Sequence, residues 1–287
     1  MTHSSATLSA TGLSWDEAIA LYELARVYVR RSWLEAISAP AAAGRRLRLP
    51  RRPGVAVGIS GGRRFGLSAR VREENGWTRL VLSELRARFG VLDYEIVGDV
   101  HARAGREEMP RDGGRVQAAG CLVRKSGVEE PMLLTAAHVI GSEGTSIPLR
   151  RAGNEVDAGI VALGSDGHFE PVAVPRQRLL GIRRKPLETG ETVFATNREG
   201  IEKRGRISLP MTDVEIRHGQ AELREFSRQI EIMGEPAPFC ADGDSGAIVY
   251  DGERRAIGLL AGGSVSRSYA SPIRRVLERL GVELVLD

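Results

Sequence analysis

The sequence is poor in cysteine, in aromatic residues and in lysine, and it has no long hydrophobic run. Its two cysteines, Cys121 and Cys240, are too few for a disulfide framework, and they predict free thiols in a reducing cytoplasm. No stretch approaches the roughly 18 consecutive apolar residues of a membrane helix. The first twelve residues also lack the basic and apolar regions of a secretory signal. We therefore expect a cytoplasmic protein that does not contact a membrane.

The positive charge comes almost entirely from arginine. The chain has 41 basic residues, of which 3 are lysines, against 37 acidic ones, and its formal net charge is +4. Arginine clusters at 45–52 and 183–185 would suit a nucleic-acid interface. The alternative is a solvated surface, and we favour it because acidic residues are interleaved and no stacking aromatics accompany the clusters. No nucleic-acid partner is expected.

The N-terminal third predicts two segments ahead of the main body. Residues 1–53 contain a helix that begins at the capping box Ser14–Glu17 and ends before Pro40, followed by an arginine-rich linker. Residues 54–112 predict a small α/β unit with two strands, a helix ending near Gly90 and a further strand at 91–100. The helix either packs its apolar face on the main body, which we favour, or serves to dock a partner.

The remaining chain, residues 113–287, has the texture of an all-β domain. With 34 glycines in 287 residues, turns are frequent, and 42% hydrophobic residues suffice for a core. Short runs rich in Val, Ile and Leu predict many strands, and Pro272–Leu280 predicts a closing helix with Gly281 as its cap. The expected strands are Val116–Val123, Met132–Thr135, Thr145–Leu149, Val156–Leu163, Thr192–Ala195, Arg206–Leu209, Val214–Arg217, Gln229–Met233, Ala247–Tyr250 and Ala256–Leu260.

Three strings in this region carry residues suited to nucleophilic catalysis. A predicted strand ends in Thr-Ala-Ala before His138, Asp157 stands at the start of an apolar strand, and Ser245 lies in the glycine-flanked turn Gly-Asp-Ser-Gly. Acyl transfer needs a hydroxyl nucleophile, a base of near-neutral pKa and a carboxylate that orients the base. It also needs backbone N–H groups aimed at the developing oxyanion, which glycine turns supply.

These strings, in the order His, Asp, Ser, resemble the chymotrypsin/trypsin family of serine peptidases. The resemblance covers about residues 115–287, and the small α/β unit loosely resembles the N-terminal part of narrow-leaf-type bacterial and plant peptidases. It implies a mostly-β double barrel with a C-terminal helix. It also implies that His138 is the general base, Asp157 its orienting carboxylate and Ser245 the nucleophile. Asp166 is a rival to Asp157, which we prefer because apolar strand residues follow it.

The same resemblance assigns further residues around the triad. The N–H groups of Gly243 and Ser245 would form the oxyanion hole. The edge formed by Ala261, Gly262 and Gly263 would pair with the substrate backbone, and Phe239 would lie near the floor of the specificity pocket or simply in the core. No acidic residue occupies 236–241, so a small or medium uncharged residue is expected before the scissile bond.

The chain also departs from the family. Secreted members pair the aspartate before the nucleophile with an N-terminus freed by cleavage, but no Ile-Val-Gly-Gly type string starts this barrel. We therefore expect Asp244 to pair with an arginine within the intact chain, and the N-terminal extension to act in docking rather than inhibition.

The function expected from the residues and the resemblance is limited proteolysis of a partner protein by a serine endopeptidase, as in regulated peptidases of bacterial stress and defence operons, with an effector encoded nearby as substrate. The alternatives are a degenerate peptidase fold that binds peptides and an esterase-like acyl hydrolase. No cofactor is expected. His101, His168 and His218 show no ligand spacing to one another or to the cysteines, so no metal is expected either. The sequence leaves the oligomeric state open.

Overall fold

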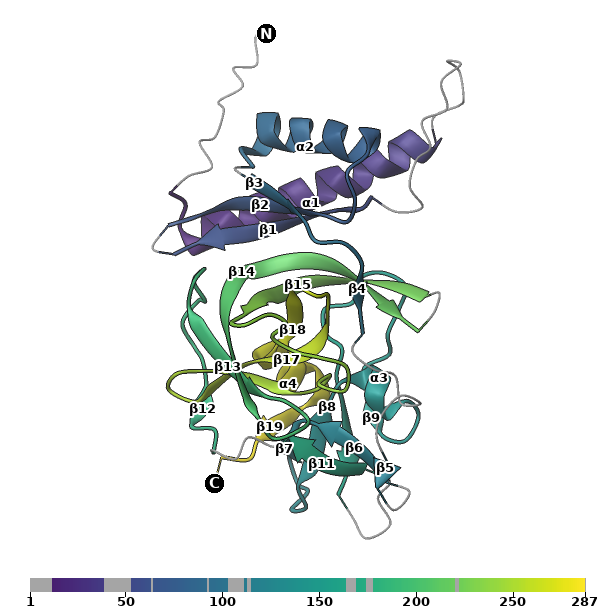
Figure 1. The fold of residues 1–287 in the computed structure, drawn as a ribbon, viewed down its shortest axis with the longest axis vertical. Coiled ribbons are helices and arrows are strands. Elements are labelled where there is room, and N and C mark those ends of the chain that lie inside the picture. Colours follow the sequence, from purple (N-terminus) through teal and green to yellow (C-terminus); the bar gives the residue numbers. More distant parts are fainter. Residues whose placement is uncertain are drawn as a thin grey trace. The chain divides into compact units, whose positions relative to one another are not determined.

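A computed structural model describes residues 12–38, 53–62, 64–91, 93–102, 111–112, 115–163, 169–173, 178–219 and 222–286 (Figure 1). The chain divides into two compact units. The first comprises Met1–Gly98 with Leu209–Thr212, and the second comprises Asp99–Ser208 with Asp213–Asp287. This division differs from the expected boundaries at 53/54 and 112/113, because the first helix packs with the small α/β unit. The arginine-rich linker at 39–52 lies outside the described residues.

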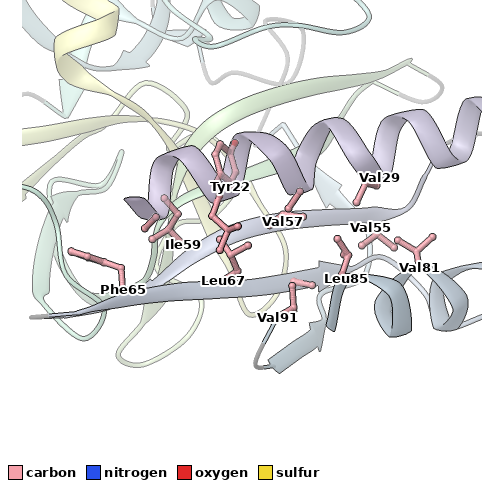
Figure 2. Close-up of a cluster of buried hydrophobic side chains, with 14 of the residues drawn as sticks. Tyr22, Val29, Val55, Val57, Ile59, Phe65, Leu67, Val81, Leu85 and Val91 are labelled. Carbon is pink, nitrogen blue, oxygen red and sulfur yellow. The ribbon is translucent and has the colours of Figure 1, made fainter. Parts of the chain in front are cut away.

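The first unit is a small sheet with two helices packed around one core. Its elements are α1 (Trp15–Ser38), β1 (Val55–Gly61), β2 (Phe65–Val71), α2 (Gly76–Phe89) and β3 (Asp93–Ile96). β1 and β2 are antiparallel, β3 joins β2 in parallel, and residues 211 and 212 pair with β1. Figure 2 shows side chains of both helices and of β1 and β2 gathered in this core, among them Tyr22, Val57 and Leu85.

The expected helix signals in the first unit are confirmed. Ser14 and Glu17 form the reciprocal hydrogen bonds of a capping box at the start of α1. α2 ends at Gly90, which adopts the left-handed conformation with φ 61°. The apolar face of α1 packs against the strands of its own unit, so it is not left exposed for docking.

In the second unit, one set of strands closes into a barrel. The strands are β13 (Thr192–Thr196), β14 (Glu202–His218), β15 (Glu222–Gly234), β16 (Ile248–Asp251), β17 (Arg255–Gly263) and β18 (Ser268–Pro272). Their hydrogen-bonded order is β13-β16-β17-β18-β15-β14, and β13 also pairs with β14. The two short strands β4 (Val100–His101) and β12 (Gly181–Ile182) add to this set.

The other set of strands in the second unit carries the histidine and aspartate strings. A five-stranded sheet has the order β19-β7-β8-β10-β9, and a three-stranded sheet has the order β11-β6-β5. Helix α4 (Ile273–Leu280) ends at Gly281, its left-handed cap, and β19 follows it. The other elements are β5 (Arg111–Asp112), β6 (Arg115–Ala119), β7 (Cys121–Lys125), β8 (Met132–Thr135), α3 (Ala137–Ile140), β9 (Thr145–Ser146), β10 (Gly159–Ala162), β11 (Phe169–Ala173) and β19 (Val282–Leu284).

The predicted fold class, a mostly-β double barrel with a C-terminal helix, is confirmed, while several strand limits differ. The expected strand 91–100 is divided into β3 and β4, with Gly98 at φ 69° between them. The expected strand 116–123 is interrupted at Gly120, where a side chain would collide with the backbone of Leu134. Two expected strands at 206–209 and 214–217 are one strand, β14, which continues through Pro210.

Both cysteines are free and buried. Cys121 packs among apolar side chains of β8, β10 and α4, and this burial raises the pKa of its thiol. Cys240 packs inside the closed barrel, where its Sγ lies 3.0 Å from Ser268 Oγ. Within the part of the chain that the structure describes, none of the helices is long and apolar enough to span a membrane.

The packing of α1 can be tested with two leucines that differ in burial. Leu21 is 7% exposed and belongs to the core of the first unit, whereas Leu24 is 61% exposed. We expect Leu21→Ala to lower the free energy of unfolding by about 2–5 kcal/mol, because it leaves a cavity. The matched control Leu24→Ala should change it by less than about 0.5 kcal/mol. Denaturant titration measures both, and equal effects would contradict the observed packing.

Candidate active site

Asp157 lies two residues before the start of β10 and is completely buried. Its Oδ2 is 2.6 Å from Nδ1 of His138, and its Oδ1 accepts a hydrogen bond of 3.3 Å from the His138 backbone N–H. His138 belongs to the short helix α3, which follows β8 immediately. β8 and β10 are antiparallel neighbours with Thr135 opposite Gly159, so the end of one meets the start of the other. The pairing of the two predicted residues therefore follows from strand register.

The segment that carries Asp157 is anchored by side chains of β15 and β18. The backbone N–H of Asp157 donates to Ser271 Oγ at 3.1 Å, and that hydroxyl donates to Gln229 Oε1 at 3.0 Å. Gln229 Nε2 donates in turn to the carbonyl of Glu155 at 2.8 Å. Asn154 adds hydrogen bonds to the carbonyl of Glu225. Both sets of strands in the second unit thus position the carboxylate.

Electrostatics keep this carboxylate ionised. Burial acts to raise the pKa of Asp157, but the charge and the hydrogen bonds of His138 outweigh it and hold the pKa below its ordinary value. When the carboxylate accepts a hydrogen bond from Nδ1–H of His138, the lone pair on Nε2 is the proton acceptor of the ring. The pair can therefore act as an oriented base.

Ser245 lies in a turn between β15 and β16 that depends on two glycines. Gly243 and Gly246 have φ values of 93° and 92°, which residues other than glycine rarely adopt. Among the described residues, the backbone N–H groups of Gly243 and Ser245 donate to no acceptor. Two neighbouring donors that are left over in a tight turn can bind a negative oxygen.

Asp244 holds this turn through backbone amides. Its Oδ1 accepts from the N–H of Arg198, and its Oδ2 accepts from the N–H of Ala241, both at 2.8 Å. Burial raises the pKa of the Asp244 carboxyl, although these hydrogen bonds oppose the shift. The partner therefore comes from within the chain, as expected, but it is a pair of amides where we expected an arginine side chain.

Gly246 brings the serine turn against the histidine string. A side chain at Gly246 would lie 2.6 Å from the Ala119 carbonyl oxygen and 2.9 Å from the Ala136 nitrogen, so the backbones approach too closely for any other residue. Ser245 is 1% exposed. Its Oγ and Nε2 of His138 are both buried without a hydrogen-bond partner among the described residues. The hydrogen bond between them that catalysis requires is not formed in this structure.

The remaining predicted residues divide between a strand edge and the core. Ala261, Gly262 and Gly263 lie at the end of β17, where Gly263 pairs with His101 of β4. Phe239 is 1% exposed and belongs to the hydrophobic cluster inside the closed barrel, against Gly205 and Gly234. It thus packs in the core. The rival carboxylate Asp166 lies outside the described residues.

The sequence did not reveal that His218 lies beside the expected triad. Its ring centroid is 5.2 Å from that of His138, in an edge-on arrangement, and 5.9 Å from the stacked ring of Phe226. His138, Asp157 and His218 each offer a potential ligand atom, and these atoms lie within 4.8 Å of one another. The sequence shows no ligand spacing for His218, yet the fold brings it close to His138 and Asp157. His218 carries no local motif, and it reaches this place as the last residue of β14.

His138 and His218 border a hollow of about 370 Å³, and Ser245 is not among the residues that line it. Burial lowers the pKa of His218 to about 4, while the nearby Asp157 carboxylate opposes the shift and the positive charges of His138 and Arg224 add to it. The neutral imidazole at pH 7 can donate or accept a hydrogen bond. The hollow is lined by His138 and His218 together with Ala102, Ala137, Gly141, Ser146, Ile147, Leu149, Gly219 and Arg224.

Comparison with solved structures finds bacterial chymotrypsin-like serine proteases. Protease A of Thermobifida fusca shares 21% identity at a TM-score of 0.44, and the match covers 61% of this chain and 94% of that one. A chymotrypsin of Cellulomonas bogoriensis shares 19% at 0.43, covering 61% and 94%. Nocardiopsis protease shares 18% at 0.43, covering 66% and 97%. No protein-family model and no curated protein sequence matches the chain. The likeness is one of fold, and the chemistry depends on the side chains described above.

The buried neutral His218 predicts a stability that depends on pH. Because its pKa is about 4 in the folded chain and about 6.5 when unfolded, the unfolded chain binds more protons between these values. The stabilisation is complete above pH 6.5 and is lost as the pH falls toward 4, by on the order of 3 kcal/mol. Urea titrations of His218→Gln should show a correspondingly smaller loss over this range. The exposed His101→Gln is the control, and an unchanged slope in His218→Gln would contradict the prediction.

Proposed function

We propose that this protein is a serine endopeptidase that hydrolyses peptide bonds with His138, Asp157 and Ser245. The observation that carries the proposal is the 2.6 Å contact between Nδ1 of His138 and the buried Asp157 carboxylate, next to a serine in a glycine turn. A buried carboxylate that fixes the tautomer of a histidine has little structural use by itself, because burial of its charge is costly. It is well suited to a base that must gain and lose a proton.

The proposed reaction has two halves, formation of an acyl group on Ser245 and its hydrolysis, and each catalytic group acts in both. Oγ of Ser245 attacks the carbonyl carbon of the scissile bond while His138 Nε2 takes its proton. The N–H groups of Gly243 and Ser245 stabilise the oxyanion, and His138 then gives the proton to the leaving amine. Water repeats these steps to release the acyl group. Asp157 stays ionised throughout and stabilises the imidazolium. The reaction requires that the Ser245–His138 hydrogen bond forms when substrate binds.

The biological role is proposed more broadly. We infer limited cleavage of a partner protein in the cytoplasm, such as an effector encoded nearby in a bacterial stress or defence operon. The substrate backbone would pair with the edge Ala261–Gly263. A small or medium uncharged residue would precede the scissile bond. Phe239 packs in the hydrophobic cluster of the closed barrel. The alternatives are a peptide-binding module without turnover and an acyl hydrolase acting on esters.

The triad assignment predicts a loss of turnover without a loss of fold. Ser245→Ala should abolish both peptide cleavage and labelling by a fluorophosphonate, because the attacking oxygen is absent. Asp157→Asn should lower kcat by about 10⁴-fold, because it favours the wrong histidine tautomer. The exposed Ser126→Ala serves as a matched control. Persistent cleavage by Ser245→Ala would refute the assignment. Labelling of the wild-type chain without turnover of any peptide would favour the binding module. Turnover of esters alone by the wild-type chain would favour the acyl hydrolase.

Asp244 predicts a separate effect on the oxyanion turn. In Asp244→Asn an amide NH₂ group replaces one acceptor oxygen, so either the Arg198 or the Ala241 N–H loses its partner. One unpaired buried donor costs about 1–3 kcal/mol. Because the turn sets the oxyanion donors, we expect kcat to fall by at least about tenfold, the equivalent of 1.4 kcal/mol, with KM little changed. Steady-state kinetics on a peptide ester decide the matter, and an unchanged kcat would show that Asp244 does not hold the turn.

A further inference from the structure

The substrate edge of β17 already has an occupant, which is a segment of the chain itself. β4 lies between β17 and β14 within the second unit. His101 pairs with Gly263 in antiparallel orientation, and Val100 and His101 pair with Ile216 and Arg217 in parallel orientation. Gly263 belongs to the edge on which the proposed function places the substrate backbone. A peptide added there would have to replace β4.

The contacts of this segment are those of a bound peptide. A side chain at Gly262 would lie 2.5 Å from the His101 carbonyl oxygen, so the glycine permits the close approach of the two backbones. The N–H of Ala102 donates to the Arg217 carbonyl at 2.8 Å, and Asp99 forms an ion pair of 3.5 Å with Arg217. β4 is thus held by main-chain pairing on both sides, as in recognition by strand addition.

The side chains of the segment alternate as in a strand that fills subsites. Val100 is 4% exposed and packs in a cluster with Ile216, Phe226 and Ala261, whereas His101 is exposed. Ala102 lines the hollow that contains His138 and His218. The chain therefore runs from a pocket for a branched apolar side chain, past the β17 edge, to a small residue beside the proposed catalytic base.

We propose that Asp99–Ala102 is an internal mimic of the substrate, which occupies the recognition edge and must be displaced before a protein substrate binds. This inference rests on the proposed function and deepens it in two ways. It identifies β4 as an inhibitory strand of the full chain, contrary to the expectation that the N-terminal extension serves only in docking. It also defines the substrate class as an extended peptide with a β-branched apolar residue, any residue and then a small residue.

The test releases β4 by two independent routes. His101→Pro removes a backbone N–H and places a ring in the ladder, while His101→Ala keeps the backbone and changes only an exposed side chain. Val100→Asp places a charge in the apolar cluster and opposes docking through the side chain. If β4 leaves about a tenth of the molecules competent, its release raises kcat/KM for a peptide substrate about tenfold. His101→Ala should match the wild-type chain.

Labelling by a small fluorophosphonate separates this inference from the proposed function. The reagent needs Ser245 and His138 but no strand pairing, so it should label the wild-type chain and all three variants at similar rates. Intact mass confirms that full-length chains are compared. Loss of labelling in every form would refute the peptidase. Normal labelling with equal or lower peptide turnover in both His101→Pro and Val100→Asp would refute the inhibitory strand and leave the peptidase in place.

A peptide in trans tests the mimicry itself. A synthetic peptide of residues 98–102 should inhibit the His101→Pro variant competitively against a peptide substrate. The same peptide with aspartate in place of its valine should inhibit at least about tenfold more weakly, because a charge cannot enter the apolar cluster. Equal inhibition by the two peptides, or none by either, would overturn the assignment of the subsites.

Discussion

The carboxylate of Asp157 has no exposed surface, so its negative charge must be paired if the second unit is to fold. Removal of such a group from water costs several kcal/mol, and the penalty is offset only by donors in good geometry. His138 supplies two of them, one from its ring and one from its backbone. The contacts that make the buried charge tolerable are therefore the same contacts that orient the histidine, so that stability and chemistry depend on one interaction.

The requirement extends into the closed barrel. Ser271 and Gln229 fix the backbone of the segment before β10, and Asn154 bonds to the neighbouring β15. Because these partners come from strands far along the chain, the geometry of the His138–Asp157 pair exists only once both sets of strands are assembled. Gly246 adds the same dependence from the opposite side, since it seats the serine turn against Ala119 and Ala136.

The sequence predicted what local chemistry encodes. The strand patterns, the capping box of α1, the Gly90 and Gly281 caps and the strings around His138, Asp157 and Ser245 each depend on neighbouring residues. The structure brings the histidine and aspartate strings together. His218 and β4 could not be found in this way. Each reaches the site by pairing between strands that are distant in sequence, and neither carries a motif. The continuity of β14 through Pro210 likewise follows from tertiary pairing, against the local tendency of proline to end a strand.

The two amides that bind Asp244 have a consequence for the range of conditions in which the turn keeps its shape. A carboxylate that pairs with a chain terminus loses its partner in mild alkali, because an α-amino group releases its proton near pH 8. The amide N–H groups of Arg198 and Ala241 do not titrate in that range, and salt screens a buried hydrogen bond far less than an exposed ion pair. The hydrogen bonds that hold the turn around Ser245 thus persist in mild alkali, and their weak side is acid, where the carboxyl itself takes up a proton.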